Sequence, residues 1–193
     1  MSNDTMDILV AIDTDTILNS VGKSFNGKVF TLSNDSTKPS QLYSYADNFG
    51  RLDQSVVYMI APRNSVIGNS QGGSELNVQM NLGDSIRWRA TSLSKGLDHA
   101  VVLYQYTQTD GNGRIGHLDQ NGPEPSPVYG SPLPIINFDN YSSTPKKQDV
   151  ENYFWQGEAQ IKGNIRYSWA FMIVDSQNKV LGYCSWDPYI TIN

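Results

Sequence analysis

Alternation of apolar and polar residues dominates the middle of the chain. From Leu76 to Ala90 almost every second residue is apolar, on either side of a Gly83-Asp84 dipeptide. A period of two places successive side chains on opposite faces of an extended strand, so one face is buried and the other meets solvent. This segment, with the strand expected after it, therefore predicts two or three β-strands around one Gly-Asp turn, with Trp88 on the buried face.

The same pattern recurs along much of the remaining chain, and no sustained helical period is present. The opening strand is apolar almost throughout, so we expect it to be central in its sheet or covered on both faces. About eight or nine strands are expected in all, which is typical of a sandwich. The sequence predicts an all-β fold: a single-domain (1–193) antiparallel β-sandwich of about eight or nine strands with two long loops. Besides those above, the expected strands are 6–12, 56–61, 99–107, 153–162, 165–173, 180–185 and 189–192.

Two stretches lack this periodicity. Residues 19–54 are rich in Ser, Asn, Asp, Gly and Lys, and residues 116–145 contain six prolines. Proline lacks a backbone N–H and is rare inside sheets. Both stretches are therefore predicted as irregular surface segments, and long loops in compact domains often carry function.

Charge and length narrow the possible partners and compartments. The net charge of -5 argues against a general affinity for nucleic acid, which needs clustered Lys and Arg. No segment has the apolar length of a membrane span, and the apolar run Ile8–Ile12 is too short and too acidic at its flank for a secretory signal. With a single cysteine and no disulfide framework, the expected compartment is the cytoplasm, with signal-independent release left open.

The sequence contains side chains that could serve as ligands for two metals, copper and calcium. The order Gly83-Asp84, His99, Cys184 is typical of copper-binding sandwiches, but no His or Met follows Cys184, so the ligand set is incomplete. We interpret Cys184 as a buried thiol. Asp13, Asp15 and the acidic and amide residues of 110–119 offer oxygen ligands, but the latter lack the Gly and terminal Glu of an EF-hand. A calcium site built from separate loops stays open, and no other cofactor is implied.

No motif for catalysis is found. The sequence has no G-x-S-x-G elbow and no phosphate-binding glycine loop, so the prediction is that the protein is not an enzyme. His99 precedes an apolar run and is expected to be a structural imidazole, whereas His117 is expected to be solvated.

The aromatic residues could serve either a core or a binding surface, because amphipathic rings stack on sugars and enrich interfaces. Trp88 and Trp169 occupy inward-facing strand positions and are expected in the core. The candidates for a surface lie near strand ends or in loops: Tyr43, Tyr45, Trp155 and Trp186.

Three blocks of the sequence carry a family resemblance. They are DILVAIDTDTIL from Asp7, LNVQMNLGDSIRWRATSLS from Leu76 with the later AVVLY, and the closing GYCSWDPYITI from Gly182. Together they resemble the bacterial AidA/PixA family, also called inclusion body proteins, from near the first residue to the last. The resemblance implies cytoplasmic crystalline inclusions for PixA-like members and quorum-regulated host interaction for AidA-like members, and it brings no catalytic residues. The inclusion-forming member is methionine-rich, whereas this chain has five Met, which disfavours a storage role.

The hypothesis from the sequence is a non-catalytic protein that associates with itself, as a homodimer or higher assembly, or binds a host partner. Its family signature is expected to be structural: Asp84 would turn the chain and accept backbone hydrogen bonds, and Arg87 and Arg89 would pair with acidic residues such as Asp187. The signature residues are Asp84, Arg87, Trp88, Arg89, Trp186 and Asp187. The alternative is a carbohydrate-binding module that uses loop aromatics and Asn or Asp side chains, with or without calcium. Its candidate ligand residues are Asp13, Asp15, Tyr43, Tyr45 and Trp155.

Overall fold

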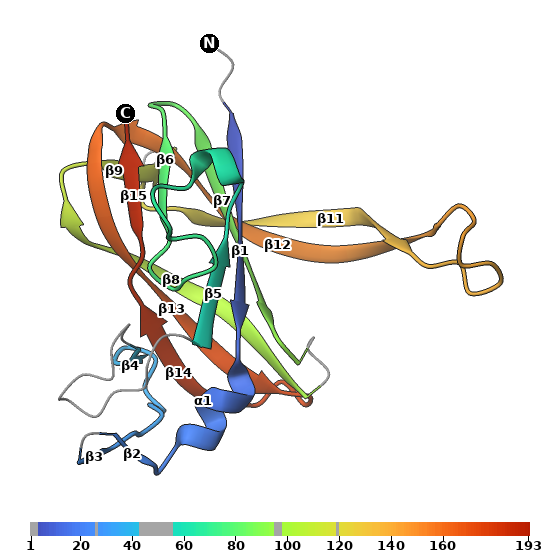
Figure 1. The fold of residues 1–193 in the computed structure, drawn as a ribbon, viewed down its shortest axis with the longest axis horizontal. Helices are drawn as coiled ribbons and strands as arrows, with labels where there is room; N and C mark the ends of the chain where they lie inside the picture. The colour runs from blue at the N-terminus through green and yellow to red at the C-terminus, as the bar shows by residue number, and fades with distance from the viewer. Residues whose placement is uncertain (1–3, 26, 43–55, 95–97, 119) are drawn as a thin grey trace.

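Two β-sheets pack face to face. The computed structural model describes residues 4–25, 27–42, 56–94, 98–118 and 120–193, and most of these residues form β-strands (Figure 1). The first sheet has seven strands in the order β10-β9-β12-β7-β1-β5, with β11 paired to β12 outside this path. Its strands are β1 (Thr5–Ile12), β5 (Val57–Ile60), β7 (Ser85–Ser92), β9 (Arg114–His117), β10 (Gln120–Asn121), β11 (Glu124–Ile135) and β12 (Lys146–Ile161).

The second sheet has six strands in the order β4-β14-β13-β15-β6, with β8 paired to β13. Three strand pairs are parallel, namely β1 with β7, β14 with β4 and β15 with β6, and the other described pairs are antiparallel. The predicted all-β sandwich is therefore confirmed, with more strands than the pattern indicated. The strands of this sheet are β4 (Ser40–Gln41), β6 (Asn77–Met80), β8 (His99–Gly111), β13 (Gly163–Asp175), β14 (Val180–Trp186) and β15 (Tyr189–Ile192).

The core lies between the inner faces of the two sheets and is rich in aromatic rings. The ring centroid of Trp88, in the first sheet, lies 5.4 Å from that of Trp169 and 5.9 Å from that of Tyr167, both in the second sheet. Both ring pairs are in edge-on geometry. The Trp88 indole N–H donates to the Tyr167 hydroxyl at 3.2 Å, so the polar atoms of this buried pair satisfy each other. The inward phase predicted for Trp88 and Trp169 is confirmed.

The opening strand is central but is covered on one face only. β1 lies between β7 and β5, and Met6, Ile8 and Val10 are buried on its inner face. Leu9, on its outer face, is 43% exposed. The expectation that this strand is central in its sheet or covered on both faces is therefore met by the first alternative, and its outer face meets solvent because the fold has two layers.

The proline-rich stretch is not a loop. Pro125 to Pro134 lie in β11, which pairs along its length with β12. β12 begins at Lys146, seven residues before the strand expected from the alternation, and the tip between the two strands spans residues 136–145. The prediction of an irregular excursion over 116–145 is therefore wrong, because prolines at alternate positions of an edge strand leave the ladder to the residues between them.

Short elements complete the fold. Helix α1 (Thr14–Ser20) follows β1, the 3-10 helix η2 (Arg63–Ser65) follows β5, and β2 (Ser24–Phe25) pairs with β3 (Lys28–Val29). The described part of the first irregular stretch, 19–54, contains the end of α1 and three very short strands, β2, β3 and β4. Within the described ranges, no helix is both long and apolar enough to cross a bilayer.

Candidate functional site

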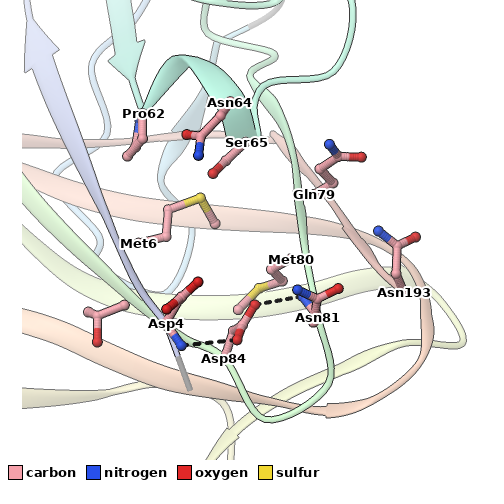
Figure 2. A pocket seen from close by; sticks show the side chains of 11 residues that line it. Asp4, Met6, Pro62, Asn64, Ser65, Gln79, Met80, Asn81, Asp84 and Asn193 are labelled. Carbon is pink, nitrogen blue, oxygen red and sulfur yellow. Dashed lines mark hydrogen bonds between the residues drawn. The ribbon is translucent and has the colours of Figure 1, made fainter. Parts of the chain in front are cut away.

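A polar pocket lies where β1 and β7 begin and β6 and β15 end. Its volume is about 420 Å³, and Figure 2 shows Asp84 at its edge, with Met6 and Met80 among the side chains that line it. Carboxylates and amides supply most of its hydrogen-bonding groups. The residues that line it are Asp4, Thr5, Met6, Pro62, Asn64, Ser65, Gln79, Met80, Asn81, Asp84 and Asn193.

The turn before β7 explains the placement of Asp84. The Asp84 N–H donates to the carbonyl of Asn81 at 3.1 Å, and Gly83 has a φ of 87°, which is the conformation that favours glycine at the third position of a type II turn. The Asp84 carboxylate accepts from the backbone N–H groups of Asn81 at 2.8 Å and Asp4 at 3.2 Å, as the dashed lines in Figure 2 show. Asp84 therefore ties the turn to the start of β1.

This geometry limits the chemistry of the pocket. Both Asp84 oxygens already accept backbone hydrogen bonds, and none of the residues lining the pocket is a His, Cys, Lys or Arg. The carboxylate of Asp84 is therefore held by the backbone in a structural role. With its carboxylates, amides and hydroxyls, the pocket can bind a small polar molecule.

The two arginines of the signature pair with Asp7. Arg87 Nη2 lies 2.6 Å and Arg89 Nη2 3.2 Å from the two carboxylate oxygens of Asp7, across the parallel pair β1 and β7. Partial burial alone would raise the pKa of Asp7, but the hydrogen bonds and charges of both arginines outweigh it and lower the pKa. The predicted pairing of Arg87 and Arg89 with Asp187 is therefore wrong, because β1 supplies their acid and Asp187 belongs to the other sheet.

Asp187 instead pairs with Arg166 of β13. Its side chain is only 6% exposed, and burial raises the pKa of its carboxyl, an effect that the hydrogen bond from Arg166 partly offsets. The pair lies in a groove of about 560 Å³ on the second sheet, which hydroxyl and amide side chains line. The terminal Trp-Asp-Pro thus ends β14 with one buried ring, Trp186, and one acid held by a neighbouring strand.

The candidate sugar-binding residues do not form one site. Trp155 packs 5.1 Å from Trp169 and donates its indole N–H to the carbonyl of Leu103 at 3.0 Å, and Trp186 is fully buried. Their interpretation as surface aromatics is wrong, because both lie where strands pass through the core. Tyr43 and Tyr45 fall outside the described residues.

The candidate calcium ligands have other partners. Asp13 caps helix α1, where its carboxylate accepts from the Thr16 N–H at 2.9 Å and from the Thr16 hydroxyl at 2.7 Å. Asp15 Oδ1 lies 3.2 Å from Nδ1 of His99, which starts β8. In the part of the chain that the structure describes, no three His, Cys, Asp or Glu side chains gather as metal ligands do.

Cys184 and His117 lie in different settings. Cys184 is a free, buried thiol in β14, and burial raises its pKa to about 12. His117 Nδ1 in β9 lies 2.7 Å from Glu124 Oε1, and its side chain is 22% exposed. The expectation of a solvated His117 is therefore wrong, because the segment that follows it returns as strand β11 beside it.

The most unusual surface is a hairpin that leaves the body of the protein. We call residues 124–156 the arm; in Figure 1 it extends as a two-stranded ribbon far beyond both sheets. Every residue of the arm is exposed or only partly buried. Several of its apolar side chains are largely exposed: Tyr129 at 77%, Leu133 at 47%, Ile136 at 49%, Phe138 at 72% and Tyr141 at 73%.

A family model described as PixA, inclusion body protein, matches residues 4–192 of the chain. The chain belongs to the PixA family of inclusion body proteins. This confirms the resemblance seen in the three sequence blocks, and it covers the arm, the Asp84 pocket and the terminal Trp-Asp-Pro alike.

Solved structures support the same fold. A crystal structure of the inclusion body protein PixA from Burkholderia cenocepacia J2315 is similar with a TM-score of 0.65, and the match covers 100% of this chain and 98% of that one. The identity is 17%, so this likeness shows the PixA fold and not a shared ligand or partner. Comparison with curated proteins gives no match.

The arm is the feature that sequence reasoning missed in this PixA family member. A signal was present: the prolines come in two pairs with one residue between them, Pro125 with Pro127 and Pro132 with Pro134. Prolines at every second position leave the intervening residues free to make a ladder on one side, as an edge strand requires. The spacing that was interpreted as a loop is therefore also compatible with an edge strand.

Proposed function

We propose that this PixA family member is a non-catalytic protein that associates with copies of itself into ordered assemblies. One observation carries the proposal: the arm, residues 124–156, contains no buried residue yet exposes four aromatic rings and several aliphatic side chains. A two-stranded hairpin has little stability of its own in water. Exposed apolar patches of this kind mark interaction surfaces.

The family supports self-association as the purpose of this surface. Inclusions are assemblies of one protein, and the family model is named for inclusion body proteins. A cytoplasmic place of assembly and a role in host interaction, which the resemblance implied, complete the proposal. Carbohydrate binding through loop aromatics is not part of it, because Trp155 packs in the core and Asp13 caps a helix.

Sedimentation of the full chain between about 1 and 100 µM tests the proposal, because protein association in this range corresponds to binding free energies of about -5 to -8 kcal/mol. The mass is expected to rise with concentration. The variant Leu133→Ser/Phe138→Ser/Tyr141→Ser should stay monomeric and folded, since all three side chains are exposed.

The matched control removes exposed apolar side chains elsewhere, in Val29→Ser/Leu93→Ser/Val180→Ser. It should associate like the unchanged protein. A full chain that stays monomeric throughout, or equal association by both triple variants, would refute the proposal.

A further inference from the structure

The outer edge of β11 cannot receive another strand. Pro125, Pro127, Pro132 and Pro134 each face a residue of β12, yet proline cannot donate to the ladder. Their pairs are therefore the non-hydrogen-bonded ones, in which the backbone points away from the partner strand. Where a neighbouring strand would need N–H donors, this edge presents carbonyls at all four positions. Edge-to-edge addition at β11 is blocked.

The other edge of the arm is protected by charge. Beyond Trp155, the described part of β12 pairs with β11 alone, so its second side is open from Lys146 to Phe154. The residues whose backbone points to that side alternate from Lys147 through Asp149 and Glu151. Charged side chains on an edge discourage strand addition. Since both edges are protected, the arm must associate through its faces.

One face of the arm carries apolar side chains beside polar ones. The register pairs Val128 with Asn152, Leu133 with Gln148 and Ile135 with Lys146, and paired residues share a face. The apolar members of this face, which we call the arm face, are Val128, Leu133, Ile135, Val150 and Phe154. Lys146, which lies on this face opposite Ile135, is paired within the arm, with its Nζ 2.9 Å from Asp139.

The arm face continues into the outer face of the first sheet. The Arg87 guanidinium lies over the Phe154 ring at 5.1 Å, and Arg87 stands beside Asp7 in the parallel register. Two residues farther along β1, Leu9 faces Ile60 of β5, and Tyr58 follows on the same side. Leu9, Ile60 and Tyr58 are 43%, 45% and 39% exposed; we call these three the wall patch.

The arm face and the wall patch are two unpartnered apolar surfaces on one chain. The arm extends away from the body, so it does not cover the wall patch of its own copy (Figure 1). We propose that the arm face of one copy packs on the wall patch of a second copy, so that two arms embrace reciprocally about a two-fold axis. This inference rests on the proposed function and names its interface.

The buried area favours a second copy over an unrelated partner. Aromatic side chains bury about 150–250 Å² each, so Tyr129 at the bulge and Phe138 and Tyr141 at the tip, all about three-quarters exposed, add several hundred Å² per arm to what the arm face offers. In a two-fold pair this surface is used twice. If each arm buries these rings against an equal area of the partner's body, around its wall patch, the total is above the ~1,200 Å² at which standard stable interfaces begin. One arm on an unrelated surface would bury about half as much.

Single-cysteine variants of the full chain test the contact. Leu133→Cys on the arm is mixed with Ile60→Cys on the wall patch under mild oxidation, and the linked peptides are identified by mass spectrometry. Native Cys184 stays out of the reaction, because it is buried and protonated. The mixed disulfide is expected to form at least about tenfold faster than the control pair of Leu133→Cys with Val180→Cys, a residue exposed on the second sheet.

The outcomes separate this inference from the proposed function. Disulfides mainly between two Leu133→Cys arms, or mixed disulfides no faster than the control, in a protein that still associates by sedimentation, would overturn the arm-on-wall contact alone. A protein that never associates would overturn both.

A second readout is the variant Ile60→Lys, which should weaken dimerisation at least tenfold without lowering the melting temperature. The exposed control Val29→Lys should leave both dimerisation and the melting temperature unchanged. Unchanged dimerisation of Ile60→Lys would also overturn the inference.

Discussion

At the scale of single residues, the signature of this chain is explained by pairs that hold strands together. Asp84 accepts two backbone N–H groups, and Asp7 accepts from both Arg87 and Arg89. Asp187, almost fully buried, depends on Arg166. A buried carboxylate that loses its partner is costly, whereas exposed pairs contribute little. Asp187 is therefore the residue of the signature most sensitive to its neighbour.

A double-mutant cycle measures this dependence. Arg166→Ala and Asp187→Asn should couple by about 1 kcal/mol in the free energy of urea unfolding, because the two side chains hydrogen-bond across neighbouring segments. The matched cycle of Arg89→Ala with Asp187→Asn should show less than about 0.5 kcal/mol, since Arg89 pairs with Asp7 in the other sheet. Equal coupling in both cycles would mean that the assigned pairs are incorrect.

At the scale of elements, the arm combines an apolar face with two protected edges. The prolines of β11 withhold backbone donors, and the charged residues of β12 deter pairing on the opposite side. Such protection is needed because a long exposed strand would otherwise recruit other chains at random. An ordered assembly needs contacts through faces, which side chains can make specific.

Restoring donors to the β11 edge should therefore cause disordered aggregation. The variant Pro127→Thr/Pro132→Thr presents two new outward N–H groups and is expected to bind thioflavin T sooner than the unchanged protein under agitation. Its folded-state stability should change by only about 1 kcal/mol, since both side chains are exposed. The control Pro145→Thr, at the tip outside the strands, should not accelerate aggregation. If the two variants aggregate at the same rate, edge protection is not the role of these prolines.

The arm also shows why part of the fold was predictable and part was not. The period of two located β7 and β13 and the inward phase of Trp88 and Trp169, because that pattern depends on burial within one strand. The parallel pairing of β1 with β7 joins segments about 80 residues apart, and no local pattern reveals it. That missing register led to the wrong partner for Arg87 and Arg89. Composition likewise misplaced β11, where proline spacing mattered more than proline content.

At the scale of the whole molecule, the β-sandwich carries one hairpin, the arm, that its core does not need. The described core lies between the two sheets, and residues 129–151 of the arm contribute no buried residue to it. The body is therefore expected to fold without residues 129–151, and association is expected to depend on them. The sandwich body therefore determines the fold, and the arm is expected to determine assembly.

The most direct test shortens the arm. Replacing residues 129–151 with Asn-Gly joins Val128 to Asn152, which face each other in the ladder, through a two-residue hairpin turn. Light scattering after size-exclusion chromatography should give a monomer mass for this variant, with a melting temperature within about 5 °C of the unchanged protein, and a dimer or larger mass for the full chain. A shortened protein that still associates as the full chain does, or a full chain that is monomeric at every concentration, would contradict assembly through the arm.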